Sequence, residues 1–259
     1  MITVFTPTYN RAYIIPKLYE SLKRQTVKDF EWLVVDDGST DNTSELLAEW
    51  TKENDFPVRY IWQPNGGKPR AITKALAEAK GEWFFIVDSD DFISDDAIET
   101  IIRYAPECTG KTGIIVFPMI NYTSGKILGK PYPAYKFICN QLEFDFKYRL
   151  IADKAEIIRT EILRQYPFPE FDDEKFVPEA IVSYRMSDKV DMLCIYKPIY
   201  YCEYLSDGYT KGFCQNLRNN PKGFALYYKE NAMRRGIPVI YRLKFWIRYI
   251  QCTIYAFVK

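Results

Sequence analysis

The sequence predicts an α/β protein built on a mostly parallel sheet, and the order of its apolar runs is the first observation behind this prediction. Short runs rich in β-branched residues, typical of buried strands, occur at residues 2–5, 31–36, 58–62 and 83–88. Helical segments separate them near 13–25, 43–54 and 68–80, and a further helix near 95–105 precedes an apolar run at 113–119. Such alternation implies a parallel sheet with helices on both faces.

Local signals mark the ends of two of these helices. The helix at 43–54 is preceded by Asp41 and Asn42, either of which suits its N-cap, and it carries Glu45 in its first turn. The helix at 68–80 is followed by Gly81, which we expect at the first position beyond the helix end.

The alternation weakens after about residue 120. We expect an amphipathic helix at 153–165, a stretch rich in proline and acids at 167–174, a helix at 177–186 and a strand at 192–197. We therefore divide the chain into a domain of residues 1–215, with halves at 1–120 and 121–215, and a helical C-terminal extension at 216–259.

The segment 237–259 has a helical pattern of its own. Basic residues lie outside its apolar arc and acidic residues are absent, so two interpretations stay open: the helix packs back on the core, or it lies on an anionic membrane surface. The arc of about 100° consists of Leu243, Trp246, Ile247, Ile250, Ile254 and Phe257.

Composition excludes several classes of function. The 35 basic and 34 acidic residues leave a formal charge of +1, which does not favour a nucleic-acid partner. The chain has no histidine, so zinc sites and proton transfer must rely on other side chains, above all carboxylates. The six cysteines include no CxxC pair, and the sequence shows no signal-peptide pattern and no apolar run of about 20 residues. These observations favour a reduced, cytoplasmic compartment.

Polar residues follow three of the predicted strands at the point where each strand ends. They occupy residues 6–11, 36–41 and 88–91, and ligands of parallel sheets bind where such ends converge. The carboxylates of Asp88, Asp90 and Asp91 would repel one another without a cation, and their hard oxygens suit Mg²⁺ or Mn²⁺. A P-loop and a GxGxxG turn are both missing, so a nucleotide diphosphate held through a metal is the simpler interpretation.

A glycine turn lies between the second and third of these motifs. Gly66 and Gly67 allow close backbone approach, and the helix that follows favours an anion at its N-terminus. Lys68 and Arg70 would neutralise phosphate charge there.

Taken together, Thr6-Pro7-Thr8-Tyr9-Asn10-Arg11, Asp36-Asp37-Gly38-Ser39, Asn65-Gly66-Gly67-Lys68 and Asp88-Ser89-Asp90-Asp91 resemble the successive signatures of family 2 glycosyltransferases. The resemblance implies a GT-A fold, which has a Rossmann-like, mostly parallel mixed sheet. It also implies an inverting, metal-dependent transfer from a UDP- or GDP-type sugar, with Mn²⁺ or Mg²⁺. It points to bacterial members that assemble cell-surface polysaccharides on glycan or lipid-linked acceptors. A sugar nucleotidyltransferase and a non-catalytic nucleotide- or glycan-binding relative stay as alternatives.

The resemblance also implies site residues. Asp36 would bind the pyrimidine edge, Asp88 would contact the ribose or a metal-bound water, and Asp90 would be the metal ligand. The donor-binding set would be Thr6, Pro7, Tyr9, Arg11, Asp36, Asp37, Gly67, Lys68, Asp88, Ser89 and Asp91. One departure is that Ile72-Thr73 stands where family members often carry Arg-Asn, which leaves open which cation meets the diphosphate.

An inverting transfer needs a carboxylate that removes the proton of the acceptor hydroxyl. The family places this base in the second half of the domain. We favour Glu179, which follows Pro178 at a predicted helix start, and Asp172, Asp173 and Glu174 stay open. Residues 203–210 resemble the flexible segment that covers the donor in the family.

These features together predict a cytoplasmic enzyme. The interpretation of 237–259 as a membrane-contacting helix would place it peripherally on the inner face of the plasma membrane.

Overall fold

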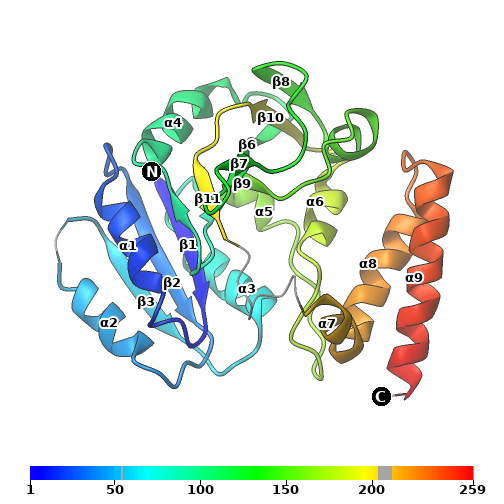
Figure 1. The fold of residues 1–259 in the computed structure, drawn as a ribbon, viewed down its shortest axis with the longest axis horizontal. Helices are drawn as coiled ribbons and strands as arrows, with labels where there is room; N and C mark the ends of the chain where they lie inside the picture. The colour runs from blue at the N-terminus through cyan, green and yellow to red at the C-terminus, as the bar shows by residue number, and fades with distance from the viewer. Residues whose placement is uncertain (54, 204–211, 259) are drawn as a thin grey trace.

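A computed structural model describes residues 1–53, 55–203 and 212–258, and its centre is one mixed sheet covered by helices (Figure 1). The main path of the sheet runs β3-β2-β1-β4-β9-β6-β10-β8. Its strands are β1 Ile2–Thr8, β2 Phe30–Asp36, β3 Val58–Trp62, β4 Trp83–Ile86, β6 Thr112–Asn121, β8 Lys136–Cys139, β9 Lys154–Arg159 and β10 Asp191–Ile195. The short strands β5 Phe92–Ile93, β7 Lys126–Ile127 and β11 Tyr200–Cys202 pair beside this path.

Strands β1 to β4 pair in parallel, as the alternation predicts, and β10 is parallel to β6. Strand β9 is antiparallel to both β4 and β6, which makes the sheet mixed. The helices are α1 Ile15–Lys23, α2 Thr43–Trp50, α3 Lys68–Glu78, α4 Ala97–Tyr104, α5 Thr160–Leu163, α6 Ala180–Met186, α7 Phe213–Asn219, α8 Pro221–Met233 and α9 Val239–Val258.

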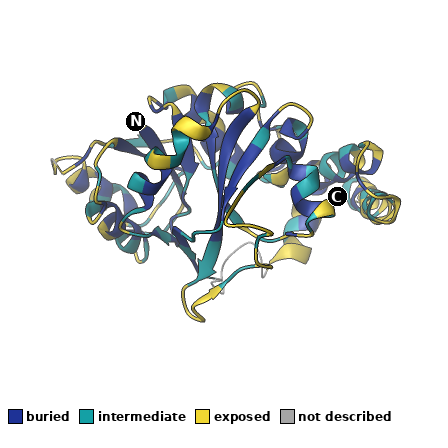
Figure 2. Cartoon of the chain, turned by 90° about the horizontal axis from the view of Figure 1, so that it is seen from above, coloured by how far each residue is buried: buried dark blue, intermediate teal, exposed yellow. Residues whose placement is uncertain are grey.

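The sheet separates two apolar cores, because successive strand side chains point to opposite faces. Val4 and Phe85 belong to the core under α1, α2 and α4, whereas Phe5 and Phe84 belong to the core under α3, α5 and α6. Both faces of the central strands are therefore buried, and Figure 2 shows them as a dark layer between the helices. This burial explains why their sequences read as continuous apolar runs. The predicted α/β fold with a helical C-terminal part is confirmed.

The helix expected at 153–165 is wrong. The segment forms strand β9 followed by the four-residue helix α5. Ile157 pairs with Phe85 of β4 on one side and with Ile115 of β6 on the other. This segment fills the gap between two central strands, and that tertiary pairing outweighs the local helical pattern.

Gly81 also plays a different part from the one expected. Helix α3 already ends at Glu78, and Gly81 does not adopt a positive φ. Its N–H donates to Thr3 Oγ1, and a Cβ at this position would lie 2.3 Å from the backbone nitrogen of Thr3. Glycine is needed there because the chain passes directly against β1.

At the N-terminus of α2, one of the two predicted residues holds the cap position and the other makes the capping hydrogen bond. Asn42 occupies the cap position without a side-chain hydrogen bond. The preceding Asp41 accepts from the backbone nitrogen of Thr43 at 3.1 Å. The capping carboxylate therefore stands one residue before the formal cap.

Helices α8 and α9 pack side by side at one end of the molecule (Figure 1). Phe245 of α9 lies 6.1 Å from the ring of Tyr228 on α8, and Cys252 is fully buried in the same contact. The predicted apolar arc faces the opposite way: Ile247 is 68% exposed and Phe257 is 92% exposed. The helix therefore packs on the fold through one side and presents a second apolar side to solvent.

No helix in the described part of the chain is long and apolar enough to cross a bilayer. The division of the chain at residues 215 and 216 stays a prediction, and this boundary falls within α7.

Candidate active site

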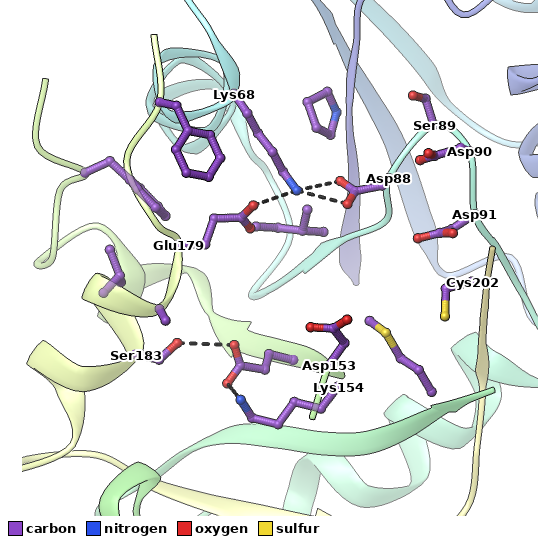
Figure 3. A pocket seen from close by; sticks show the side chains of 18 of the residues that line it. Lys68, Asp88, Ser89, Asp90, Asp91, Asp153, Lys154, Glu179, Ser183 and Cys202 are labelled. Carbon is purple, nitrogen blue, oxygen red and sulfur yellow. Dashed lines mark hydrogen bonds and ion pairs between the residues drawn. The ribbon is translucent and has the colours of Figure 1, made fainter. Parts of the chain in front are cut away.

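A cavity of about 990 Å³ opens where the carboxyl ends of β1 and β4 face the N-terminus of α3 and the start of α6. Close-up, the side chains of residues 88–91, which we call the acidic motif, and of Glu179 converge on it from opposite walls (Figure 3). Most residues of the predicted site line this cavity, namely Pro7, Tyr9, Arg11, Asp37, Gly67, Lys68, Asp88, Ser89, Asp90, Asp91 and Glu179.

Thr6 and Asp36, also predicted to contact the donor, do not line the cavity. The Thr6 hydroxyl accepts a hydrogen bond from the Trp32 indole at 2.9 Å. Asp36 is fully buried, and its carboxylate accepts from the backbone of Ser39 at 2.8 Å and from the Tyr60 hydroxyl at 3.0 Å. This geometry gives both side chains a structural role behind the site and does not support their assignment as donor contacts.

The neighbouring Asp37 shapes the glycine turn. Its carboxylate accepts from the backbone nitrogens of Gly66 at 2.8 Å and Gly67 at 2.7 Å. Gly67 has a φ of 92°, and a Cβ there would lie 1.8 Å from the carbonyl oxygen of Lys175. Only glycine fits this position, and the turn it forms delivers Lys68 to the first residue of α3.

Lys68 joins the two halves of the domain. Its ammonium lies 2.7 Å from a carboxylate oxygen of Asp88 and 2.7 Å from one of Glu179 (Figure 3). Burial opposes its charge, but the two carboxylates outweigh this, so the pKa of Lys68 is raised and the ammonium stays protonated. Burial also raises the pKa of Glu179, with Lys68 opposing the shift and the charge of Asp88 adding to it.

Tyr200 of β11 ties the acidic motif together. Its hydroxyl donates to Asp91 at 2.7 Å and accepts from the backbone nitrogen of Asp88 at 3.0 Å. Burial and then the charges of Asp88 and Asp90 raise the pKa of Asp91 to about 8. The pKa of Asp90 is raised as well, first by burial and then by Asp88.

This electrostatic crowding fits a divalent cation, which would relieve it. Among the described residues, no three acidic or cysteine side chains lie close enough together to bind a metal ion on their own. That is compatible with Mg²⁺ or Mn²⁺, since such ions take many ligands from water and substrate phosphates. Asp90 is the carboxylate of this chain that we expect to hold it.

Two of the other candidate bases are engaged elsewhere. Glu174 is buried, and its two carboxylate oxygens accept from the backbone nitrogens of Lys222 at 2.7 Å and Gly223 at 2.8 Å. It therefore caps the N-terminus of α8. Asp173 pairs with the Lys222 ammonium at 2.8 Å, and neither it nor Asp172 lines the cavity. The geometry thus favours Glu179.

Arg70 does not face the cavity either. Its guanidinium donates to the carbonyl oxygens of Gly66 at 2.8 Å and Phe171 at 2.6 Å. It therefore holds the glycine turn against the 171–175 segment, and Lys68 is the cation of this turn that faces the acidic motif.

Comparison with known proteins gives the family of this chain. The family model described as Glycosyl transferase family 2 matches residues 3–165. The chain belongs to this family. Glycosyltransferase GlyG of Streptococcus pneumoniae is 29% identical over 191 residues, 67% of this chain and 62% of that protein. Chondroitin synthase of Pasteurella multocida is 37% identical over 103 residues, 40% of this chain and 11% of the synthase. The family 2 chain thus spans less than two thirds of these relatives.

Solved structures share the fold of this family 2 glycosyltransferase. Staphylococcus aureus TarS, in complex with UDP-GlcNAc, superposes with a TM-score of 0.73 at 22% identity, covering 97% of this chain and 72% of the other. Mannosyltransferase PcManGT of Pyrobaculum calidifontis, in complex with GDP-Man and Mn²⁺, superposes with a TM-score of 0.63 at 16% identity, covering 98% and 73%.

The sequence missed a group of polar residues on the far side of the same cavity. Lys154 and Glu156 come from β9, the segment expected to be helical, and Ser183 comes from α6 (Figure 3). Their signal is the period-two spacing of residues 154 and 156, which would have placed both on one face of a strand. The predicted covering segment at 203–210 lies outside the described residues apart from Glu203, which lines the cavity.

Proposed function

We propose that this family 2 glycosyltransferase performs a metal-dependent, inverting transfer from a UDP-sugar to a glycan or lipid-linked acceptor in cell-surface polysaccharide biosynthesis. The observation that carries the proposal is the position of Lys68 between Asp88 and Glu179. It connects the acidic motif that suits a nucleotide diphosphate to a carboxylate able to act as base. The complex of TarS with UDP-GlcNAc and the activity named for chondroitin synthase support the donor and acceptor classes.

In the proposed mechanism Glu179 accepts the proton of the acceptor hydroxyl. The hydroxyl oxygen then bonds to the anomeric carbon from the face opposite the leaving group. The bond between that carbon and the phosphate oxygen breaks, and its electron pair leaves with the nucleoside diphosphate. A bound Mn²⁺ or Mg²⁺ would stabilise the charge of the leaving diphosphate. Lys68 adds a fixed positive charge beside Asp88, and its low exposure strengthens its attraction for the leaving diphosphate.

Substitution of the base gives the direct test. Glu179→Gln keeps the size of the side chain but cannot take up a proton, so we expect transfer to fall by about 10²–10⁴-fold. UDP affinity in the presence of Mn²⁺ should stay within a factor of a few. Glu49→Gln, an exposed site on α2, is the matched control. Retained turnover in Glu179→Gln would exclude this residue as the base.

The nucleotide product separates the proposal from its alternatives. A transferase releases a nucleoside diphosphate from a nucleotide sugar when Mn²⁺ is supplied, whereas a nucleotidyltransferase forms or consumes pyrophosphate. A non-catalytic relative releases neither. A panel of UDP- and GDP-sugars assayed for diphosphate release therefore decides the reaction class and the donor together.

We also propose that α9 holds the enzyme peripherally on an anionic membrane surface. Its outward side is apolar along the whole helix, and no acidic residue interrupts it. Lys244 and Arg248 are exposed beside this side and complement anionic headgroups. Trp246 lies at the margin between the apolar side and the packed side, a position that suits a membrane interface.

Flotation with anionic vesicles tests this attachment. The double substitution Ile247→Glu with Ile254→Glu places two charges on the outward side and should abolish binding. Ile138→Glu, at an exposed position of β8, is the matched control and should bind as the parent does. The parent chain could instead fail to bind vesicles and form a concentration-dependent dimer that the double variant does not form. That result would show that α9 contacts a second copy of the chain, and it would overturn the membrane proposal.

A further inference from the structure

The part of the cavity beyond Glu179 is lined by the later half of the domain, and we call this part the second compartment. Ser183 lies one helical turn beyond Glu179 and faces the same space, so this compartment begins directly beside the proposed base (Figure 3). We define it by the polar side chains that line it, namely Gln141, Asp145, Lys154, Glu156, Ser183 and Tyr184.

The walls of the second compartment are held by two hydrogen-bonded groups. Glu156 pairs with Lys154 at 3.0 Å and accepts from the Ser183 hydroxyl at 3.3 Å. Asp145 accepts from the Gln141 amide at 2.7 Å and from the Tyr184 hydroxyl at 2.7 Å. These contacts come from strand β9, helix α6 and the segment 141–145, and they fix the side chains before any ligand enters.

One side-chain acceptor atom in this compartment has no hydrogen-bond partner among the described residues. Gln141 is 5% exposed, and its amide nitrogen donates to Asp145. Its side-chain oxygen accepts no hydrogen bond from any residue that the structure describes. A buried polar atom left without a partner is costly, so a ligand donor that reaches this oxygen would remove that cost. Sugar hydroxyls supply such donors.

The charges of the compartment select among sugars. Asp145, Glu156 and the adjacent lining residue Asp153 are carboxylates, and Lys154 is the cation among the described residues of this wall. That cation is already paired with Glu156. The surplus of negative charge repels a ligand carboxylate or phosphate and accepts hydrogen bonds from hydroxyls.

We propose that the second compartment binds the terminal sugar of the acceptor and that this sugar is an uncharged ring, not a uronate or a phosphorylated sugar. The inference rests on the proposed transferase function and narrows its acceptor class. Gln141 and Glu156 accept hydrogen bonds from ring hydroxyls, and the reacting hydroxyl points back to Glu179. Specificity then comes from the carboxylates that reject an acidic ring.

Matched glycosides test the inference on the full chain. We would measure the affinities of methyl β-glucoside and methyl β-glucuronide, and of the corresponding galactose pair, with UDP and Mn²⁺ present. The neutral ring of at least one pair should bind about tenfold or more tightly than its uronate, since like charges are brought together in the uronate complex. Equal or tighter binding of both uronates overturns the proposal, and so does failure of all four glycosides to bind.

Variants then locate the binding. Glu156→Gln should reduce the ratio of the neutral glycoside's affinity to that of the uronate. Ser183→Ala should lower the affinity for the neutral glycoside. Ser187→Ala, at the end of the same helix with its hydroxyl bound to the Tyr184 carbonyl, is the control and should match the parent. If Glu156→Gln or Ser183→Ala changes UDP affinity and leaves glycoside affinity intact, the compartment serves the donor and the proposal fails. Diphosphate release from a UDP-sugar by the parent chain stays a separate readout of the transferase function.

Discussion

Glu174 is one of the acids that the sequence left open as the base, so a substitution there tests whether this residue serves stability or catalysis. Its two carboxylate oxygens accept from the first turn of α8, at Lys222 and Gly223. Glu174→Gln keeps one acceptor oxygen but turns an amide nitrogen toward the other backbone N–H. We therefore expect a loss of stability with transfer per folded molecule preserved.

The size of the loss follows from the contacts. A hydrogen bond to a charged group contributes about 1.5–3 kcal/mol, and one of the two is lost. The charge also interacts with the helix dipole, which adds about 0.3–1 kcal/mol. The sum, about 2–4 kcal/mol, lowers the Tm by roughly 5–15 °C in a chain of this size.

Thermal unfolding followed by circular dichroism measures the shift, with Glu49→Gln as the exposed control. The reasoning also requires that transfer by Glu174→Gln, assayed well below its Tm, stay within a factor of a few of the parent. A Tm equal to that of the control would refute the capping role. A transfer defect matching that of Glu179→Gln at an unchanged Tm would refute the choice of base.

Three further predictions concern the cavity itself. Gly67→Ala should weaken UDP binding and lower the Tm, since its Cβ would meet the Lys175 carbonyl at 1.8 Å. Gly110→Ala, also at positive φ but with nothing within 4 Å, should cost only about 1–2 kcal/mol by the same Tm measurement. Lys68→Met leaves the facing carboxylates without their cation and should weaken UDP binding by tenfold or more, measured by calorimetry with Mn²⁺. Burial raises the pKa of Glu179, which must be ionised to act as a base. As the pH is lowered, kcat/KM should therefore begin to fall at a pH above the ordinary pKa of a glutamate. This acid limb should be absent from the residual rate of Glu179→Gln.

The first half of the fold could be predicted because its signals are local. The first four apolar runs form strands that pair in parallel, although the edge strand β3 is only half-buried, and each segment between them forms an amphipathic helix. The rule that ligands bind at the carboxyl ends of such strands then locates the cavity without coordinates. The acidic motif after β4 and the glycine turn before α3 both line it.

The choice between neighbouring residues needed the structure. Asp36 and Asp37 are adjacent in the sequence, yet one is sealed behind the site by Tyr60 and the other lines the cavity. The contact between Lys68 and Glu179 joins residues far apart in the chain. Nothing in the local pattern fixes such a distance, because it depends on how β9 and α6 pack against the first four strands.

The incorrect helix at 153–165 had the largest consequence for the site. On a helix, residues 154 and 156 would point in directions about 200° apart, so they could not share a wall. On a strand they point to the same face, and here that face is the cavity, while Ala155 and Ile157 point into the opposite core. The pairing of β9 with β4 and β6 therefore creates the pair of charged side chains from which the proposed acceptor compartment is built. The misread periodicity hid the wall formed by Lys154 and Glu156, so the sequence located the acidic motif and Glu179 but not the compartment beyond them.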